Sequence, residues 1–304
     1  MRPFHPILLA LCLGALLVSG CGEDESGGDG AISVVATTTQ LGDFARQVGG
    51  KRADVEQILP PNADPHDYEP RPSDVRDLEG ADVILRSGGD VDEWLTELID
   101  SSGSDAARVE VSKSVKEREG DPHWWQDPRN VVRAVGAIER ALAEADPAGR
   151  AEYERNAAAY IARLRKLDRA VATCIGKLQR GARKLVTTHD ALGYYADRYG
   201  LEVIGAVIPS LSSQAQPSSK AIGELVDQIR KEEVKAIFPE SSLSSKLEDA
   251  VSRESGASVG GELWADTLGP EGSSGASYVD SIASNTGEIV KGLSGGDVAC
   301  RPRV

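Results

Sequence analysis

The sequence predicts an α/β protein of two lobes, in which parallel sheets are flanked by helices and one long linking helix joins the lobes. Each half alternates short strand-like runs with amphipathic helical patterns, which is typical of parallel sheets covered on both faces. The segment "VVATTTQLGDFARQVGG" (34–50) resembles "LVTTHDALGYYADRYGL" (185–201), and each reads as a strand followed at once by a helix. This similarity indicates two lobes built on one plan, with a chance match of two strand–helix units as the alternative.

Apolar and β-branched runs predict the other strands, and helical periodicity predicts the segments between them. In the first half the expected strands are 53–60, 81–88 and 107–114, with helices over 72–80 and 90–102. In the second half the expected strands are 201–209, 234–240 and 256–266, with helices over 217–232 and 244–256.

A long helix is predicted between the two halves. Its apolar residues recur at alternating steps of four and three, which is the spacing of one helix face. These residues are Tyr153, Ala157, Tyr160, Leu164, Leu167, Val171, Cys174 and Leu178. Some 30 residues at about 1.5 Å each span roughly 45 Å, which is long enough to bridge two lobes. We therefore expect a first lobe over 31–146, a linking helix over 147–180 and a second lobe over 181–304.

The first twenty residues, "MRPFHPILLALCLGALLVSG", read as a cleaved signal peptide. Their apolar run is too short to span a membrane, and the small residues before Cys21 resemble a bacterial lipobox. We expect a lipid on Cys21 and a flexible tether over 21–30, which together hold the protein on the outer face of the cell membrane. The alternatives are an ordinary secretory signal or a buried N-terminal helix.

Charge and cysteine content fit an exported protein. The formal net charge of −14 disfavours nucleic acid as a partner and suits a protein that meets cations. Cys174 and Cys300 are the two cysteines left beyond Cys21, and a pair in an exported protein predicts a disulfide, with two free thiols as the alternative.

Three histidines remain after the signal peptide, and each follows a predicted strand. His66 and His123 lie in proline-containing loops of the first half, and His189 follows the strand "KLVTT" of the second, where the strand gives way to a helix. Ligands of parallel α/β sheets bind beyond the carboxyl ends of the strands. Each histidine alone reads more simply as a loop or helix-cap residue, but together they indicate a site for a transition metal.

Four motifs, in order, carry a resemblance to a known family. They are "DPHDYEPRPSD", "DPHWWQDPRN", "THDALGYYADRYGL" and "ADTLGPEGSSGASYVDSIASN". They resemble the metal receptors of ABC importers of the ZnuA/TroA type over nearly all of the mature chain. The resemblance implies two α/β lobes joined by a single long helix, a metal ion in the cleft between them, and delivery of that ion to a membrane permease.

Carried over motif by motif, the resemblance implies His66, His123, His189 and Asp266 as metal ligands. Asp266 could instead cap the following turn. Glu240, in "IFPESS", could hold the ring of a ligand histidine, ligate the metal itself or act as a structural cap.

Three imidazoles and one carboxylate favour Zn²⁺ as the transported ligand, with Mn²⁺ or Fe²⁺ as alternatives. Manganese receptors of this family tend to have glutamate at the position of His189. The segment before His123 lacks the long histidine-rich loop of many zinc receptors, which weakens the case for zinc.

We expect a binding protein and not an enzyme, and we expect it to be a monomer. A zinc-dependent hydrolase is the rival from another class, since a catalytic zinc keeps one coordination position for water. An adhesin role for the same fold is a further alternative.

Overall fold

The computed structural model describes Met1, residues 30–118 and residues 120–304. The predicted signal peptide, the lipidated Cys21 and the tether lie outside these residues, apart from Met1 and Gly30, and remain predictions. Contacts group residues 31–304 into one compact unit. No helix among the described residues is long and apolar enough to cross a membrane.

The first lobe contains a four-stranded parallel sheet in the order β2-β1-β3-β4. Its strands are β1 Ile32–Ala36, β2 Ala53–Gln57, β3 Val83–Arg86 and β4 Ala107–Glu110. The helices of this lobe are α1 Thr39–Gly49, α2 Pro72–Glu79, α3 Leu95–Ser102 and α4 Pro128–Ala145.

Helices cover both faces of this sheet because its central strands are apolar on both sides. Val34 and Val83 point into the core formed with α1 and α4. Their neighbours Val35 and Ile84 point to the other face and pack with residues of α2 and α3. The alternation follows from the two-residue period of a strand.

The second lobe contains two short parallel pairs, β5-β6 and β7-β8, which a bridge between Thr187 and Phe238 connects. Its strands are β5 Lys184–His189, β6 Glu202–Ile208, β7 Ala236–Ile237 and β8 Ser258–Val259. Its helices are α6 Gly193–Tyr199, α7 Ser219–Lys231, α8 Lys246–Ser255 and α9 Tyr278–Leu293.

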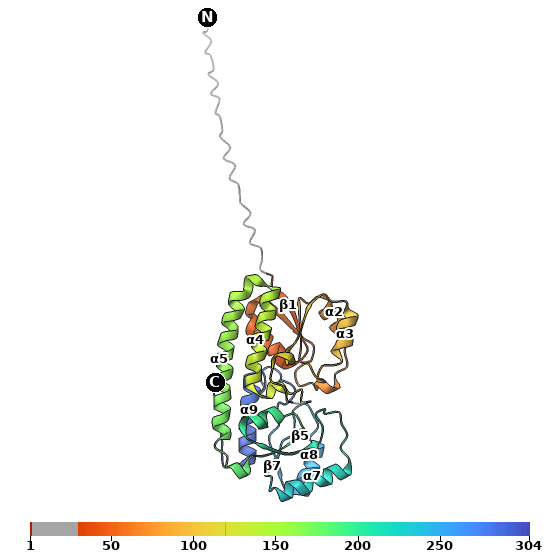
Figure 1. Cartoon of the computed structure of the whole chain (residues 1–304), viewed down its shortest axis with the longest axis vertical. Helices are drawn as coiled ribbons and strands as arrows, with labels where there is room; N and C mark the ends of the chain where they lie inside the picture. The colour runs from red at the N-terminus through yellow and green to blue at the C-terminus, as the bar shows by residue number, and fades with distance from the viewer. Residues whose placement is uncertain (2–29, 119) are drawn as a thin grey trace. The chain divides into compact units, whose positions relative to one another are not determined.

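The linking helix is α5, Arg150–Ile175, which has 26 residues. It begins after a 3-10 turn at Pro147–Gly149 and ends earlier than the predicted 180. Its predicted apolar stripe is buried throughout. It packs against α1 and α4 at one end and α9 at the other (Figure 1). One hydrophobic cluster therefore runs from the first lobe along α5 into the second.

Several sequence expectations need correction. The strand predicted over 107–114 ends at Glu110 and continues as a 3-10 turn, and the strand predicted over 256–266 is regular only at Ser258–Val259. Helix α9 was not predicted, because its serines, threonine and glycines are weak helix formers. Packing of its buried face, together with the Ser277 cap on Asp280 N, stabilises it.

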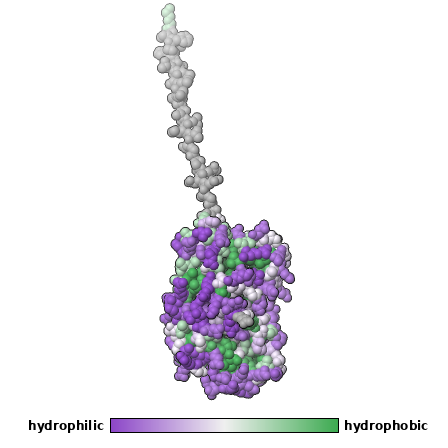
Figure 2. Space-filling model, viewed as in Figure 1, coloured by the Kyte–Doolittle hydropathy of each residue, from purple (hydrophilic) through white to green (hydrophobic). Residues whose placement is uncertain are grey.

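The surface is largely hydrophilic on the face shown in Figure 2, with apolar residues in small groups. Apart from Met1, the exposed large apolar residues of the described chain are Val203, Leu247 and Val259, all in the second lobe. Most apolar residues of both lobes are thus buried in the core.

The structure contains the predicted disulfide. Cys174 and Cys300 are joined, with 126 residues of sequence separation and Cα atoms 5.5 Å apart. The bond ties the C-terminal tail to the end of α5.

Replacing either Cys174 or Cys300 with serine should lower the free energy of unfolding by about 2–4 kcal/mol, because the unfolded chain gains the freedom of a long open loop. Urea denaturation of the variants and the parent measures this. Peptide mapping without reduction should recover the two cysteine peptides joined; two alkylatable thiols in the non-reduced protein would contradict the prediction.

Candidate metal centre

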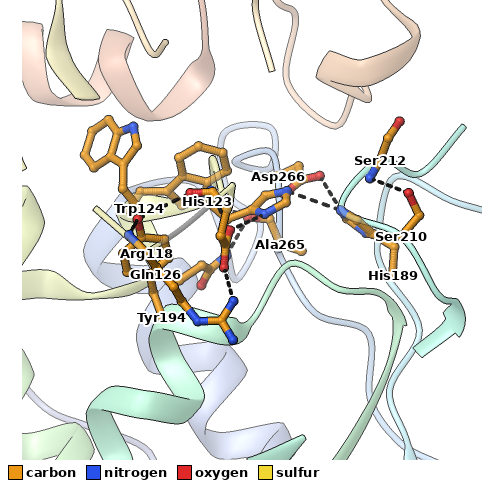
Figure 3. A network of polar contacts seen from close by, with 12 residues as sticks. Arg118, His123, Trp124, Gln126, His189, Tyr194, Ser210, Ser212, Ala265 and Asp266 are labelled. Carbon is orange, nitrogen blue, oxygen red and sulfur yellow. Dashed lines mark hydrogen bonds and ion pairs between the residues drawn. The ribbon is translucent and has the colours of Figure 1, made fainter. Parts of the chain in front are cut away.

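The structure brings together His66, His123, His189 and Asp266. One potential ligand atom from each lies within 4.8 Å of the others. Asp266 Oδ2 is 3.1 Å from His189 Nε2 and 3.4 Å from His66 Nε2, and its Oδ1 is 3.5 Å from His123 Nε2. Figure 3 shows Asp266 facing His123 and His189. All four side chains are at most 3% exposed.

Four separate segments supply these residues. His66 lies in the 3-10 turn Pro65–Asp67 after β2, and His123 directly precedes the turn Trp124–Gln126. His189 is the last residue of β5, and Asp266 lies in the segment between β8 and α9. Segments that follow strands in both lobes, and the end of β5 itself, therefore converge on one point, as the position of ligands in parallel α/β sheets predicts.

A carboxylate holds the ring of His189. Glu240 Oε1 accepts hydrogen bonds from the Nδ1–H (2.7 Å) and the backbone N–H (3.0 Å) of His189. This contact assigns the proton to Nδ1 and leaves the Nε2 lone pair toward the cluster. Of the alternatives for Glu240, the geometry matches the ring-holding one, since Glu240 is not among the four clustered residues.

Asp121 does the same for His123, and sequence reasoning missed it. Asp121 Oδ1 accepts from Nδ1–H (2.9 Å) and backbone N–H (3.0 Å) of His123. The sequence did carry a signal for this role of the aspartate, because Asp-Pro-His occurs twice in the chain. In the other copy Asp64 Oδ1 accepts from the backbone N–H of His66 at 2.9 Å. The motif forms a local turn that orients the histidine.

The segment that carries Asp266 is held by the first lobe, although it belongs to the second half of the sequence. The carbonyl of Ala265 accepts from Trp125 Nε1 at 2.9 Å and from Gln126 Nε2 at 2.7 Å, and Gln126 and Ala265 are labelled in Figure 3. Leu268 N donates to Thr39 Oγ1 at 2.8 Å. Trp125 therefore both packs beside His123 and positions Asp266.

Electrostatics in the cluster depend on Asp266. Burial by itself would raise the pKa of Asp266, but the neighbouring His189 and His123 hold it well below its usual range. Burial by itself would lower the pKa of His189, but Asp266 and Glu240 raise it well above its usual value. For His66, the hydrogen bond and charge of Asp266 likewise outweigh burial and raise the pKa.

The residues fit a metal ion. Asp266 Oδ1 is buried and accepts no hydrogen bond, and an unpaired buried carboxylate oxygen is unfavourable unless a cation binds it. Three imidazoles and one carboxylate at these separations offer a compact donor set of mixed nitrogen and oxygen, of the kind that binds first-row divalent metals.

This fold and this donor set define a class of two-lobed α/β metal-binding proteins. The family model of ZnuA, described as the periplasmic component A of a zinc-uptake complex, matches residues 34–292, and the chain belongs to this family.

Named relatives agree with the assignment. The manganese-binding lipoprotein MntA of Halalkalibacterium halodurans is 33% identical over 290 residues, which cover 92% of this chain and 95% of that protein. The metal ABC transporter substrate-binding lipoprotein SloC of Streptococcus mutans is 29% identical over 305 residues, covering 95% and 98%. The structure of the periplasmic zinc-binding protein TroA of Treponema pallidum matches with a TM-score of 0.81 and 29% identity, covering 87% of this chain and 99% of that one. The predicted family and fold class are confirmed.

Asp266→Asn should lower the pKa of both His66 and His189 in the metal-free protein, because it removes the charge that raises them. Histidine C2–H chemical shifts followed by NMR across pH measure this. In the parent both residues should titrate above 6.5, the ordinary value. Asp67→Asn, which changes an exposed carboxyl next to His66, is the control. Unchanged titration in Asp266→Asn would contradict the assignment.

The same shifts give the metal-free fold a pH dependence. The pKa of His189 is raised in the folded protein. The stability that this contributes is fully present at pH values below the pKa of the unfolded state and is lost as the pH rises through the pKa of the folded state. The pKa of Asp266 is lowered in the folded protein. The stability that this contributes is fully present at pH values above the pKa of the unfolded state and is lost as the pH falls through the pKa of the folded state. The ion pair therefore stabilises the metal-free protein between these two limits.

Proposed function

We propose that the protein is a lipid-anchored extracytoplasmic receptor that captures Zn²⁺ with His66, His123, His189 and Asp266 and delivers it to an ABC-type metal permease. The observation that carries the proposal is the convergence of these four buried side chains from both lobes on one point. Membership of the ZnuA family supports the transport role. The lipoprotein relatives support the anchor at Cys21 and a location on the outer face of the cell membrane.

Zinc is favoured by the donor set, because three neutral imidazoles and one carboxylate match the four-coordinate preference of Zn²⁺. Manganese is the second candidate, and the observation that favours it is the 33% identity to a manganese-binding lipoprotein. Iron(II) would accept the same donors. Mn²⁺ prefers more oxygen ligands than this cluster supplies, so titration of both ions in parallel separates the candidates.

The proposal assigns binding and no catalysis. A catalytic zinc has three protein ligands and an exchangeable water, with a general base beside it. Here four protein side chains face one another, and the nearby carboxylates Asp121 and Glu240 already accept hydrogen bonds from histidine rings. A spectroscopic ligand count on the zinc- or cobalt-loaded protein that found three protein ligands and a water would favour the hydrolase instead.

Substituting His66, His123 or His189 with alanine should each weaken zinc binding by more than the roughly 10–100-fold expected for loss of an outer hydrogen-bond partner. Glu240→Gln should fall within that smaller range, because it keeps all four ligands. Titration calorimetry with zinc and manganese measures the affinities, and metal analysis of protein purified without added metal identifies the native ion. Circular dichroism should show an intact fold in each variant. If a histidine variant binds both ions as tightly as the parent, the substituted histidine is not a metal ligand.

Zinc affinity should fall with falling pH, because protons compete with the ion for the imidazoles. The raised pKa values of His66 and His189 place the start of this decline above pH 6.5. More than one proton should be taken up per ion released. Competition titrations with a chelator at several pH values give the slope of log affinity against pH. A slope below one proton per ion between pH 5 and 6 would instead indicate a carboxylate-dominated site, whose ligands protonate near pH 4.

A further inference from the structure

Arg118 connects the segment that precedes His123 to the second lobe. Its Nε donates to Asp197 Oδ2 on α6 at 3.1 Å, and its backbone N–H donates to the hydroxyl of Tyr194, also on α6, at 2.6 Å. Its Nη1 donates to Asp121 Oδ2 at 3.0 Å. Figure 3 shows Arg118 beside Tyr194 and close to His123. We call these three hydrogen bonds the Arg118 contact.

The carboxylate of Asp121 is shared between this contact and the metal centre. Its Oδ1 accepts from the ring of His123, while its Oδ2 accepts from Arg118. The side chain of Asp121 is fully buried, that of Arg118 is 38% exposed and that of Asp197 is 70% exposed. An unbroken chain of hydrogen bonds thus runs from α6 of the second lobe to a ring of the first.

Helix α6 is shaped to receive this chain. Its first residue is Gly193, and a Cβ there would lie 2.6 Å from Arg118 Nη1 and 2.7 Å from Asp121 Oδ2. Both separations are shorter than real Cβ contacts, so any larger residue would displace the pair. The glycine has an ordinary helical position, and this close approach is the physical reason that the position favours it.

Two cavities adjoin the Arg118 contact. One, of about 340 Å³, is lined by Arg118, Tyr194 and Asp197 among others. The other, of about 480 Å³, is lined by Asp121, Tyr194 and Trp124 among others. Tyr194 lines both cavities, so the Arg118 contact borders open space.

We propose that Arg118 is a positioning residue for metal retention: it fixes Asp121, and through it the ring of His123, against the second lobe, and so slows release of the bound ion. The proposal rests on the metal-binding function proposed above. The hydrogen bond from Arg118 to the buried Asp121 should slow release of the ion most, since exposed ion pairs such as that with Asp197 are weak. The association rate of the ion should change little, because loss of the Arg118 contact leaves all four ligands in place.

The test is stopped-flow release of zinc and of manganese into excess chelator from the full mature chain. Arg118→Gln should raise the dissociation rate about tenfold, the lower end of the range for outer partners of a ligand. The association rate should stay within about twofold of the parent, since the ligands themselves are unchanged. Asp197→Asn should raise the dissociation rate only about two- to fivefold. Arg108→Gln, which breaks an exposed ion pair with Asp100 inside the first lobe, should leave both rates unchanged.

Two further variants separate positioning from general stability. Gly193→Ala keeps every hydrogen-bonding group but displaces the pair, and it should also speed release. If Arg118 acts through Asp121, adding Arg118→Gln to Asp121→Asn should not increase the dissociation rate of the ion any further. Additive effects in this double variant would overturn the proposal.

A measurement without metal distinguishes this proposal from the proposed function. Amide hydrogen exchange of residues 120–126 and of α6 should rise in metal-free Arg118→Gln and not in Arg108→Gln. If the parent binds neither ion, the proposed function fails, and the positioning role fails with it. If the parent binds but Arg118→Gln releases both ions at the parental rate, only the positioning role of Arg118 is overturned.

Discussion

The contact between Asp266 and three imidazoles is the constraint on which the site depends. One carboxylate faces three ring nitrogens within 3.5 Å, and all four side chains are at most 3% exposed. In the metal-free protein this carboxylate raises the pKa of His189 and His66, and the histidines in turn lower its own. The same convergence that offers a donor set to a cation therefore makes protons its competitor. Binding and release of an ion can be read as exchange between these two kinds of positive charge.

The rest of the fold brings four short segments to that point and keeps them there. Each lobe ends its strands toward the cluster, and α5 packs along both lobes as part of one hydrophobic core. Asp266 illustrates how closely the lobes are interleaved. Its segment follows β8 of the second lobe, yet Ala265 is hydrogen-bonded to Trp125 and Gln126 of the first.

Around the four clustered residues lies a set of carboxylates with distinct tasks. Glu240 and Asp121 each use one oxygen for both the ring and the backbone N–H of a histidine, although one comes from a distant strand end and the other from two residues upstream. The remaining oxygen of Asp121 faces Arg118. Ring orientation is thus set by partners on both lobes, which is why a substitution outside the four ligands can alter metal binding.

The sequence by itself determined the alternation of strands and helices, the long linking helix, the cysteine pair and the placement of the three histidines after strands. Those features are local: they follow from side-chain periodicity, from breaker residues and from residue types that occur only a few times. Asp266 came from family resemblance, since an aspartate after an apolar run has no local mark of a ligand. Only the tertiary structure decided that α9 is helical, that Asp121 and Glu240 hold the histidine rings, and that Arg118 reaches α6. These depend on groups up to 79 positions apart meeting in space, and on burial that turns weak local preferences into definite contacts.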